Sequence, residues 1–392
     1  MNPSSSGWID KYIFSLQKDA AVFSNFHPDE FYAAIRNTGF IYGHSVVTVY
    51  DKIDSEYTLT QDELAKVNLL HSLMGIYFYC HPQSDFEKCT ETIFRFYNKL
   101  LPRKKGFLNR IQFKIKRNIH LEKIISKRVS KINITENQPF EKIMTDALLF
   151  MDIVVFHNFL KGKTDLHAFV ESLEYQIIYN CFLALNSKKN KTKDDLQLIE
   201  LFKQSELYFD NRSVNYKLLH DTYAKKYLLD LTALGVWNDL HLEKDEKQFL
   251  ENLAAQLHLD QNTVEEASEA LQNFVKQHTI NLRLFQHKNP VKELYKESTQ
   301  VVKLLILRNK KRLSKELEKN KELMLLLGKS TYATLSYEEK LSVKNQFMEI
   351  AKTVPSLAIF ILPGGSLLLP LLVKFIPEIL PNTFRDNQIP KK

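Results

Sequence analysis

The chain has 392 residues, a net charge of +8 at pH 7 and only ten glycines, beside 26 phenylalanines and 17 tyrosines. Average usage is roughly 7% glycine, so this scarcity excludes collagen-like and glycine-rich disordered chains and argues against barrels, propellers and nucleotide-binding α/β sheets. With 44% hydrophobic and 26% charged residues, the composition is typical of a folded globular protein of two or three domains.

The N-terminal residues 1–19 contain no basic segment followed by an apolar core, so they do not resemble a secretory signal. The three cysteines, Cys80, Cys89 and Cys181, form no Cys-x-x-Cys pair and no disulfide framework. We therefore expect a reducing compartment, in which these thiols pack as small hydrophobic groups.

Helical periodicity extends over most of the chain, and strand-like alternation is confined to residues 42–50. Thr60 and Glu63 form a capping box before apolar residues at steps of three and four, and Ser336 and Glu339 form a second one. We predict an all-α protein whose body is a multi-helix bundle. Further helical segments are expected at 141–160, 165–186, 193–209, 214–234, 243–258, 261–280 and 291–327.

Polar stretches divide the chain at residues 133–139, 186–193 and 286–290. From these breaks we expect three parts: an N-terminal helical domain at 1–186, a central helical domain at 193–290 and a C-terminal region at 291–392.

The segment Lys99–Ile132, here called the basic band, has twelve Lys and Arg residues and one acid, Glu122, so it carries +11. Apolar residues alternate with these charges at helical steps. Such a helix can lie on anionic lipid or neutralise RNA phosphates, or it can simply dock by its apolar face with its lysines in solvent. The candidate lipid or RNA contacts are Arg103, Lys104, Lys105, Arg110, Lys114, Lys116, Arg117, Lys127 and Arg128.

Two groups of residues contain ligand-type side chains that could hold a metal ion. His167, Glu171 and Glu174 share one face of an expected helix, but without ligands from a second helix they do not predict a metal centre. An EF-hand starting at Asp239 would need Gly and Glu where Lys244 and Leu250 stand, so that assignment fails. We expect no bound metal.

The region 237–271, where an acidic turn precedes a helix, weakly resembles the TerB-like module of tellurite-resistance proteins. Ordinary capping of a helix N-terminus explains the same acidic residues. Phosphate-binding loops, dinucleotide fingerprints and nucleophile elbows are absent from the sequence, so we expect neither an enzyme nor a cofactor.

The C-terminal region contains the longest uncharged run, Thr353–Val373. As one helix its 21 residues would extend about 31 Å, close to the ~30 Å hydrocarbon core of a membrane. Pro363, Pro370 and Pro377 would kink such a helix toward one side, whereas Gly364 and its neighbour Gly365 would favour two short helices. The run is therefore a spanning helix, a re-entrant interfacial segment or a buried helical hairpin.

The stretch 325–384 resembles the core signature of the Letm family, the leucine-zipper/EF-hand transmembrane proteins and their short bacterial relatives. The resemblance lies in the capped helix at 335–340 and in repeated prolines, as in Leu-Pro-Gly-Gly at 362–365 and Leu-Pro-Asn-Thr-Phe at 380–384. It implies membrane association. The matching positions of the membrane segment are Pro355, Pro363, Gly364, Gly365, Ser366, Pro370, Lys374, Pro377 and Pro381.

Family roles implied by the resemblance are cation/proton exchange and the docking of ribosomes at a membrane. Mitochondrial members carry an acidic residue inside the apolar run, where this chain has Ser366, so exchange loses support. In the mitochondrial members, a larger ribosome-binding domain follows the position of Phe384. We do not expect the present chain to dock ribosomes through that larger domain. The EF-hand and long coiled coils are missing too.

We therefore expect a membrane-associated docking or scaffold protein, acting in ribosome binding at a membrane or in envelope and ion homeostasis. The alternatives are a cation/proton exchanger or other ion transporter, and a soluble RNA- or ribosome-binding protein with the apolar run buried. The expected partners are membrane lipid, a ribosome or RNA, and a second copy of the chain, with no small-molecule substrate. The helical body is expected in the cytoplasm.

Overall fold

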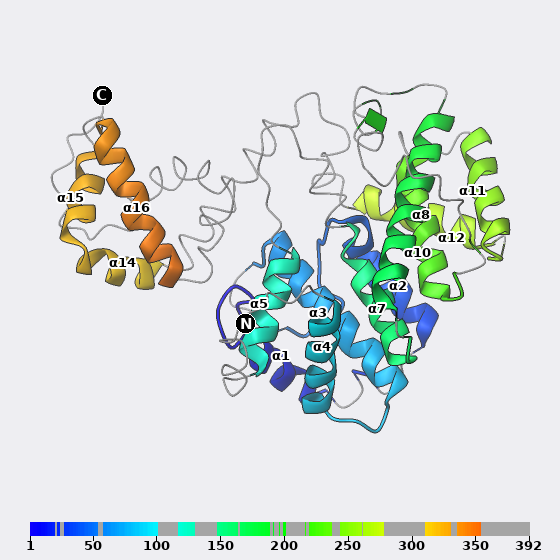
Figure 1. Cartoon of the computed structure of the whole chain (residues 1–392), viewed down its shortest axis with the longest axis horizontal. Helices are drawn as coiled ribbons and strands as arrows, with labels where there is room; N and C mark the ends of the chain where they lie inside the picture. The colour runs from blue at the N-terminus through cyan, green and yellow to red at the C-terminus, as the bar shows by residue number, and fades with distance from the viewer. Residues whose placement is uncertain are drawn as a thin grey trace.

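The computed structural model describes residues 1–19, 22–23, 27–53, 58–100, 117–129, 147–163, 165–188, 191, 196, 199–200, 216, 219–236, 244–260, 262–277, 310–330 and 335–353. Within these ranges the chain forms thirteen α-helices and one short 3₁₀-helix, and no β-strand (Figure 1). The predicted all-α class and helical bundle body are confirmed.

The described helices have the following bounds, in chain order: α1 Trp8–Gln17, α2 Pro28–Asn37, η1 Phe40–Tyr42, α3 Gln61–Cys80, α4 Phe86–Leu100, α5 Arg117–Val129, α7 Phe150–Leu160, α8 Leu166–Ser187, α10 Thr222–Val236, α11 Lys244–Gln256, α12 Asn262–Gln277, α14 Lys310–Lys319, α15 Lys321–Ser330 and α16 Tyr337–Thr353.

Helix α3 runs through the middle of the N-terminal helices and begins at the predicted capping box. Thr60 accepts a hydrogen bond from the backbone N–H of Glu63, whose carboxylate accepts one from the N–H of Thr60. Residues from Ala65 to Phe78 are buried on every side of α3, which contacts α4, α5 and α7. The capping box therefore starts a helix that is part of the core over most of its length.

The strand expected at residues 42–50 is wrong. Tyr42 ends η1, and the chain after it has no strand partner in the described residues. Instead, the side chain of Asn68 in α3 accepts a hydrogen bond from Val49 N–H and donates one to Val47 C=O, both at 2.9 Å. One buried amide thus satisfies backbone groups that a neighbouring strand would otherwise satisfy.

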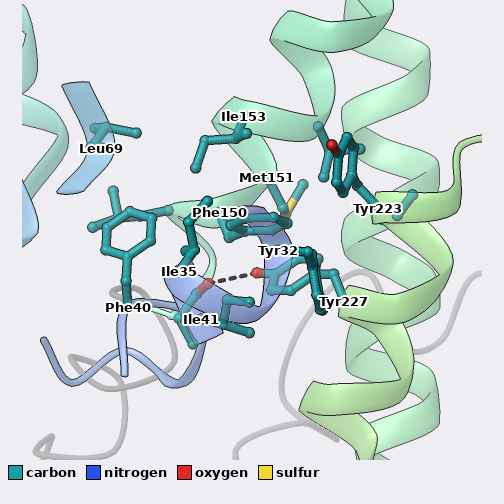
Figure 2. Packing of buried hydrophobic residues seen from close by; sticks show 14 of the residues in the cluster. Tyr32, Ile35, Phe40, Ile41, Leu69, Phe150, Met151, Ile153, Tyr223 and Tyr227 are labelled. Atoms are coloured by element: carbon teal, nitrogen blue, oxygen red, sulfur yellow. Dashed lines mark hydrogen bonds between the residues drawn. The ribbon is translucent and has the colours of Figure 1, made fainter. Parts of the chain in front are cut away.

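The hydrophobic core is continuous from Trp8 in α1 to Phe274 in α12. It crosses the predicted division at 186–193, because α8 packs along α10 and α10 also contacts α7 and α12. The two expected domains therefore share one core. Figure 2 shows part of it, where Tyr32 of α2 and Phe150 of α7 pack against aromatic residues of α10.

A polar link fixes α2 against α10 inside this core. Tyr32 donates a hydrogen bond to Asp230 at 2.5 Å, and the guanidinium of Arg36 lies 3.5 Å from the same carboxylate. Burial raises the pKa of Asp230, although the Arg36 charge and the Tyr32 hydrogen bond act in the opposite direction. A buried carboxylate with two partners of this kind orients the helices with respect to each other.

Candidate functional site

The basic band is described only over α5, Arg117–Val129. Lys127 and Arg128 of the candidate contacts lie in this helix with described side chains, and Arg117 begins it. The remaining candidates lie outside the described residues: Arg103, Lys104, Lys105, Arg110, Lys114 and Lys116.

Helix α5 docks on the body through an apolar stripe. Leu121, Ile125 and Val129 stand at steps of four, and each is at most 1% exposed. Helices α1, α3 and α4 cover this stripe. The apolar face expected from the periodicity is therefore used for packing in the body, which leaves only the polar side of α5 for any other contact.

The single acid of the basic band points inward. The carboxylate of Glu122 accepts hydrogen bonds from the backbone N–H groups of Gly7 and Ile9, at 2.9 and 3.1 Å, at the start of α1. These donors belong to the first turn of a helix, where N–H groups lack partners within the helix and the helix dipole favours a negative charge. Burial raises the pKa of Glu122, against the effect of the backbone hydrogen bonds. Because the Glu122 carboxylate caps the start of α1, it does not offset the basic charges on the exposed side of α5.

Arg128 also points inward. Its Nε and Nη2 atoms donate to Asp152 of α7 at 2.8 and 2.6 Å, and Tyr97 of α4 donates to the same carboxylate at 3.0 Å. Asp152 is almost completely buried. The charge of Asp152 raises the pKa of Arg128. This guanidinium therefore holds α5 to α7, and its charge is already neutralised within the protein.

Two lysines of α5 remain on the surface. The side chains of Lys123 and Lys127 are exposed, four residues apart on the helix, so they lie on one face. The predicted lipid or RNA contacts include Lys127. They do not include Lys123, although it belongs to the basic band. Among the described side chains of α5, these two lysines are the basic groups best placed to meet an anionic partner.

The predicted membrane segment, including Pro355, Ser366 and Pro381, lies outside the described residues. Among the helices that are described, none combines the length and the apolar character needed to cross a membrane.

Helices α14, α15 and α16 pack on one another and form a separate small core. Asn320 separates α14 from α15 and caps α15, since its side chain accepts a hydrogen bond from Leu323 N–H at 3.1 Å. The buried residues are contributed by all three helices and by the residue just before the last capping box: Leu313, Leu317, Leu323, Met324, Leu327, Leu335, Val343, Phe347 and Ile350.

The capping box predicted at Ser336 is present at the start of α16. Ser336 Oγ accepts a hydrogen bond from Glu339 N–H at 3.2 Å, and the Glu339 carboxylate accepts one from Ser336 N–H at 2.9 Å. Lys329 of α15 pairs with the same carboxylate at 2.5 Å, and Glu322 accepts a hydrogen bond from Ser342. The later residue of α15, Lys329, pairs with the earlier residue of α16, Glu339, and the earlier Glu322 pairs with the later Ser342. The two helices are therefore antiparallel.

Large apolar side chains are exposed on this three-helix group. Tyr337 is 81% exposed and Leu341 45% exposed, and their spacing of four residues places them on the same face of α16. On α15, Leu325 is 68% exposed. Sequence reasoning included all three in the Letm-like stretch but did not separate them from buried neighbours such as Phe347. Single exposed apolar residues are common, but two that share one helix face, as Tyr337 and Leu341 do, can form part of a contact surface.

The other groups considered from sequence are not assembled into a site. His167 and Glu171 are exposed on α8, and no set of three or more His, Cys, Asp or Glu side chains in the described ranges is arranged to hold a metal ion. Asp239 lies outside those ranges, and Lys244 begins α11.

Comparison with known proteins finds one relationship. Residues 335–392 match the family model described as "LETM1-like, RBD". The match begins at the residue before the α16 capping box, so α14 and α15 pack against the matched segment from outside it. No curated protein and no solved structure matches the chain. The C-terminal segment is thus related to the Letm family, which confirms the resemblance found from its sequence; the match covers much less than half of the chain.

Proposed function

We propose that this chain is a membrane-associated docking protein that binds ribosomes through its Letm-related C-terminal segment. The observation that supports this most directly is the match of residues 335–392 to the family model described as "LETM1-like, RBD", because ribosome docking is one of the roles that the Letm resemblance implies. The same segment had suggested membrane association by its apolar run, and the match adds a reason to expect a ribosome as the partner.

The packing of α16 supports this role. Its buried side, with Val343, Phe347 and Ile350, is covered by α14 and α15, whereas Tyr337 and Leu341 face solvent. A helix held in this way presents a preformed surface, and binding through it costs little ordering entropy. We assign Tyr337 and Leu341 to the docking surface.

The basic band supplies the second part of the proposal. With Glu122 and Arg128 turned into the body, the exposed charges among the described side chains of α5 are Lys123 and Lys127, and both are positive. Each basic residue near an anionic membrane contributes about 1 kcal/mol to binding, and the contribution is screened by salt. We propose that this face of the body lies against anionic lipid.

Cell fractionation tests the membrane part of the proposal. We expect the full chain to pellet with membranes and to remain there after a carbonate wash, and a chain lacking residues 354–392 to be released by carbonate or by high salt. This deletion leaves the three-helix group of α14 to α16 complete. Full release of the intact chain by salt alone would show peripheral attachment. If the intact chain does not pellet with membranes at all, the membrane part of the proposal is wrong.

A further inference from the structure

Helices α11 and α12 form a helical hairpin at one edge of the body, beside α8 and α10 (Figure 1). The chain turns between them at His258, which has a positive φ of 53°, and Leu259 N–H donates to Ala254 C=O at 2.9 Å. Lys247 of α11 lies 3.3 Å from Glu265 of α12. The hairpin therefore has internal contacts of its own. The docking function proposed above uses neither helix.

An apolar stripe on α12 packs against α10 and α2. Its members stand at steps of three and four, and each is at most 3% exposed: Val264, Ala267, Leu271 and Phe274. Phe274 lies directly on the backbone of Gly39, which has a φ of +77° and precedes η1. A Cβ atom at Gly39 would overlap the Phe274 ring and the His44 carbonyl. The body is therefore shaped to receive α12 at this place.

A guanidinium with incomplete hydrogen bonding lies against the same helix. Nη1 of Arg36 donates to the Glu266 carbonyl of α12 at 3.3 Å and lies 3.5 Å from the Asp230 carboxylate. Both distances are long for a charged donor, which normally approaches an oxygen to 2.7–2.9 Å. Nε of this guanidinium is buried and has no partner within the described part of the chain. Docked α12 thus covers a cation that water would solvate better.

Tyr42 of η1 repeats this situation. Its ring centre lies 5.4 Å from that of Phe274, and the residue is 1% exposed. Its hydroxyl has no hydrogen-bond partner in the described ranges, whereas the hydroxyl of Tyr32 donates to Asp230. A buried polar group without a partner has lost its bonds to water and received nothing in exchange. The closed position of α12 therefore carries a free-energy cost that access of water would remove.

We propose that α11 and α12 form a lid, which opens as one unit while the rest of the body stays folded. The apolar stripe and the contact of Phe274 with Gly39 hold the lid closed. The incomplete hydrogen bonding of Arg36 and Tyr42 opposes closure, so opening requires less free energy than global unfolding. In the open state water binds both groups, and the carboxylate of Asp230 becomes accessible from the same side.

Native-state hydrogen exchange of the full chain, followed by mass spectrometry, measures this opening. We expect the amides of α12 to exchange at least about 100-fold faster than the slowest amides of α3, because α3 is exposed only by global unfolding. Equal protection of α12 and α3 would show that the hairpin opens only when the whole body unfolds. That result would overturn the proposal.

Two Tyr→Phe variants separate lid opening from global unfolding. Tyr97→Phe removes a hydroxyl that is paired with Asp152 at 3.0 Å, away from the lid. We expect about fivefold faster exchange in α3 and no change in α12. Tyr42→Phe removes an unpaired hydroxyl under the lid, so exchange in α12 should slow by at least about threefold. Equal acceleration of α12 and α3 by Tyr97→Phe, or unchanged or faster α12 exchange in Tyr42→Phe, would refute the lid.

Low concentrations of urea provide the same separation without a variant, and they decide if Tyr97→Phe fails to fold or changes neither helix. The effect of urea on an opening reaction grows with the surface that the opening exposes. Lid opening exposes less surface than global unfolding, so urea should accelerate exchange in α3 steeply and in α12 only weakly. The same steep dependence in both helices would rule out a separate opening of α11 and α12.

Discussion

Arg128 of α5 makes a two-pronged ion pair with Asp152 of α7, with N–O distances of 2.6 and 2.8 Å. The pair shows that members of one basic stretch have different roles. Arg128 is neutralised in the interior, whereas Lys127, its neighbour in the chain, is exposed. The two residues carry the same charge, so they form a matched pair for separating structural from binding effects.

Arg128→Ala should strongly destabilise the protein. Within the described part of the chain, the substitution leaves the buried carboxylate of Asp152 with the Tyr97 hydroxyl as its remaining partner, and breaking such a pair costs about 3 kcal/mol or more. We expect Lys127→Ala to change the free energy of unfolding by less than about 0.5 kcal/mol, as for other exposed positions. Urea unfolding followed by circular dichroism measures both. Equal effects of the two substitutions would mean that the ion pair contributes nothing to folding.

The exposed lysines of α5 should control attachment to anionic surfaces. Lys123→Glu combined with Lys127→Glu reverses two charges, so we expect at least a tenfold weaker binding to vesicles containing anionic lipid, at about 1 kcal/mol for each basic residue. Binding should approach that of the wild type as salt screens the charges. Co-sedimentation with vesicles at low and high salt provides the measurement. Unchanged binding at low salt would remove α5 from the lipid-binding surface.

Folding stability should depend on pH through His157. Burial by itself lowers the pKa of His157, but the carboxylate of Asp221, 2.6 Å from its Nδ1, raises the folded-state pKa from 6.5 to about 9. The folded protein therefore holds this proton more tightly than the unfolded chain. The resulting stabilisation is fully present below pH 6.5 and is lost as the pH rises through 9. We expect the wild type to lose about 2 kcal/mol over this window relative to His157→Gln. Urea midpoints at pH 6.5 and pH 9 test the difference, and parallel curves for the two proteins would contradict it.

The capping box of α16 should determine how firmly the Letm-related segment is ordered at its start. Ser336→Ala removes the acceptor of the Glu339 N–H hydrogen bond and should cost about 1 kcal/mol of local stability, whereas Ser336→Asn retains an acceptor. Hydrogen exchange of the first-turn amides of α16 reports this directly. Exchange rates that do not differ between the Ala and Asn variants would show that the box does not stabilise the helix.

The sequence was sufficient for the all-α class and for the starts of α3 and α16, because capping boxes and apolar spacing are local signals. Other boundaries were wrong: the helix expected at 214–234 begins at Thr222, and the one expected at 291–327 is divided at Asn320. Both boxes, at Thr60 and Ser336, lie where they were predicted. The strand at 42–50 was wrongly predicted because alternation alone does not show that a distant Asn68 side chain satisfies the backbone.

The sequence does not show which charged side chains are buried in ion pairs and which are exposed. Charge and periodicity place Arg128 and Lys127 in one basic stretch, but only the position of α7 shows that Arg128 faces Asp152. The same holds for Glu122, whose partners lie at the start of α1. A weak signal did exist for the buried polar partners of α7: this helix is strongly apolar and yet carries Asp152 and His157, and polar residues inside an apolar helix require partners from other helices.

In the proposed function, ribosomes dock through the exposed face of α16. Purified ribosomes should co-float with vesicles carrying the full chain, and Tyr337→Ser combined with Leu341→Ser should reduce the bound ribosomes at least tenfold. Both side chains are exposed, so the helix stays folded, and Glu338→Gln with Asn345→Ser on the same helix is the matched control. Loss of ribosomes in the first variant and retention in the control is the predicted result. Equal ribosome flotation with wild type, double variant and control would contradict docking through α16.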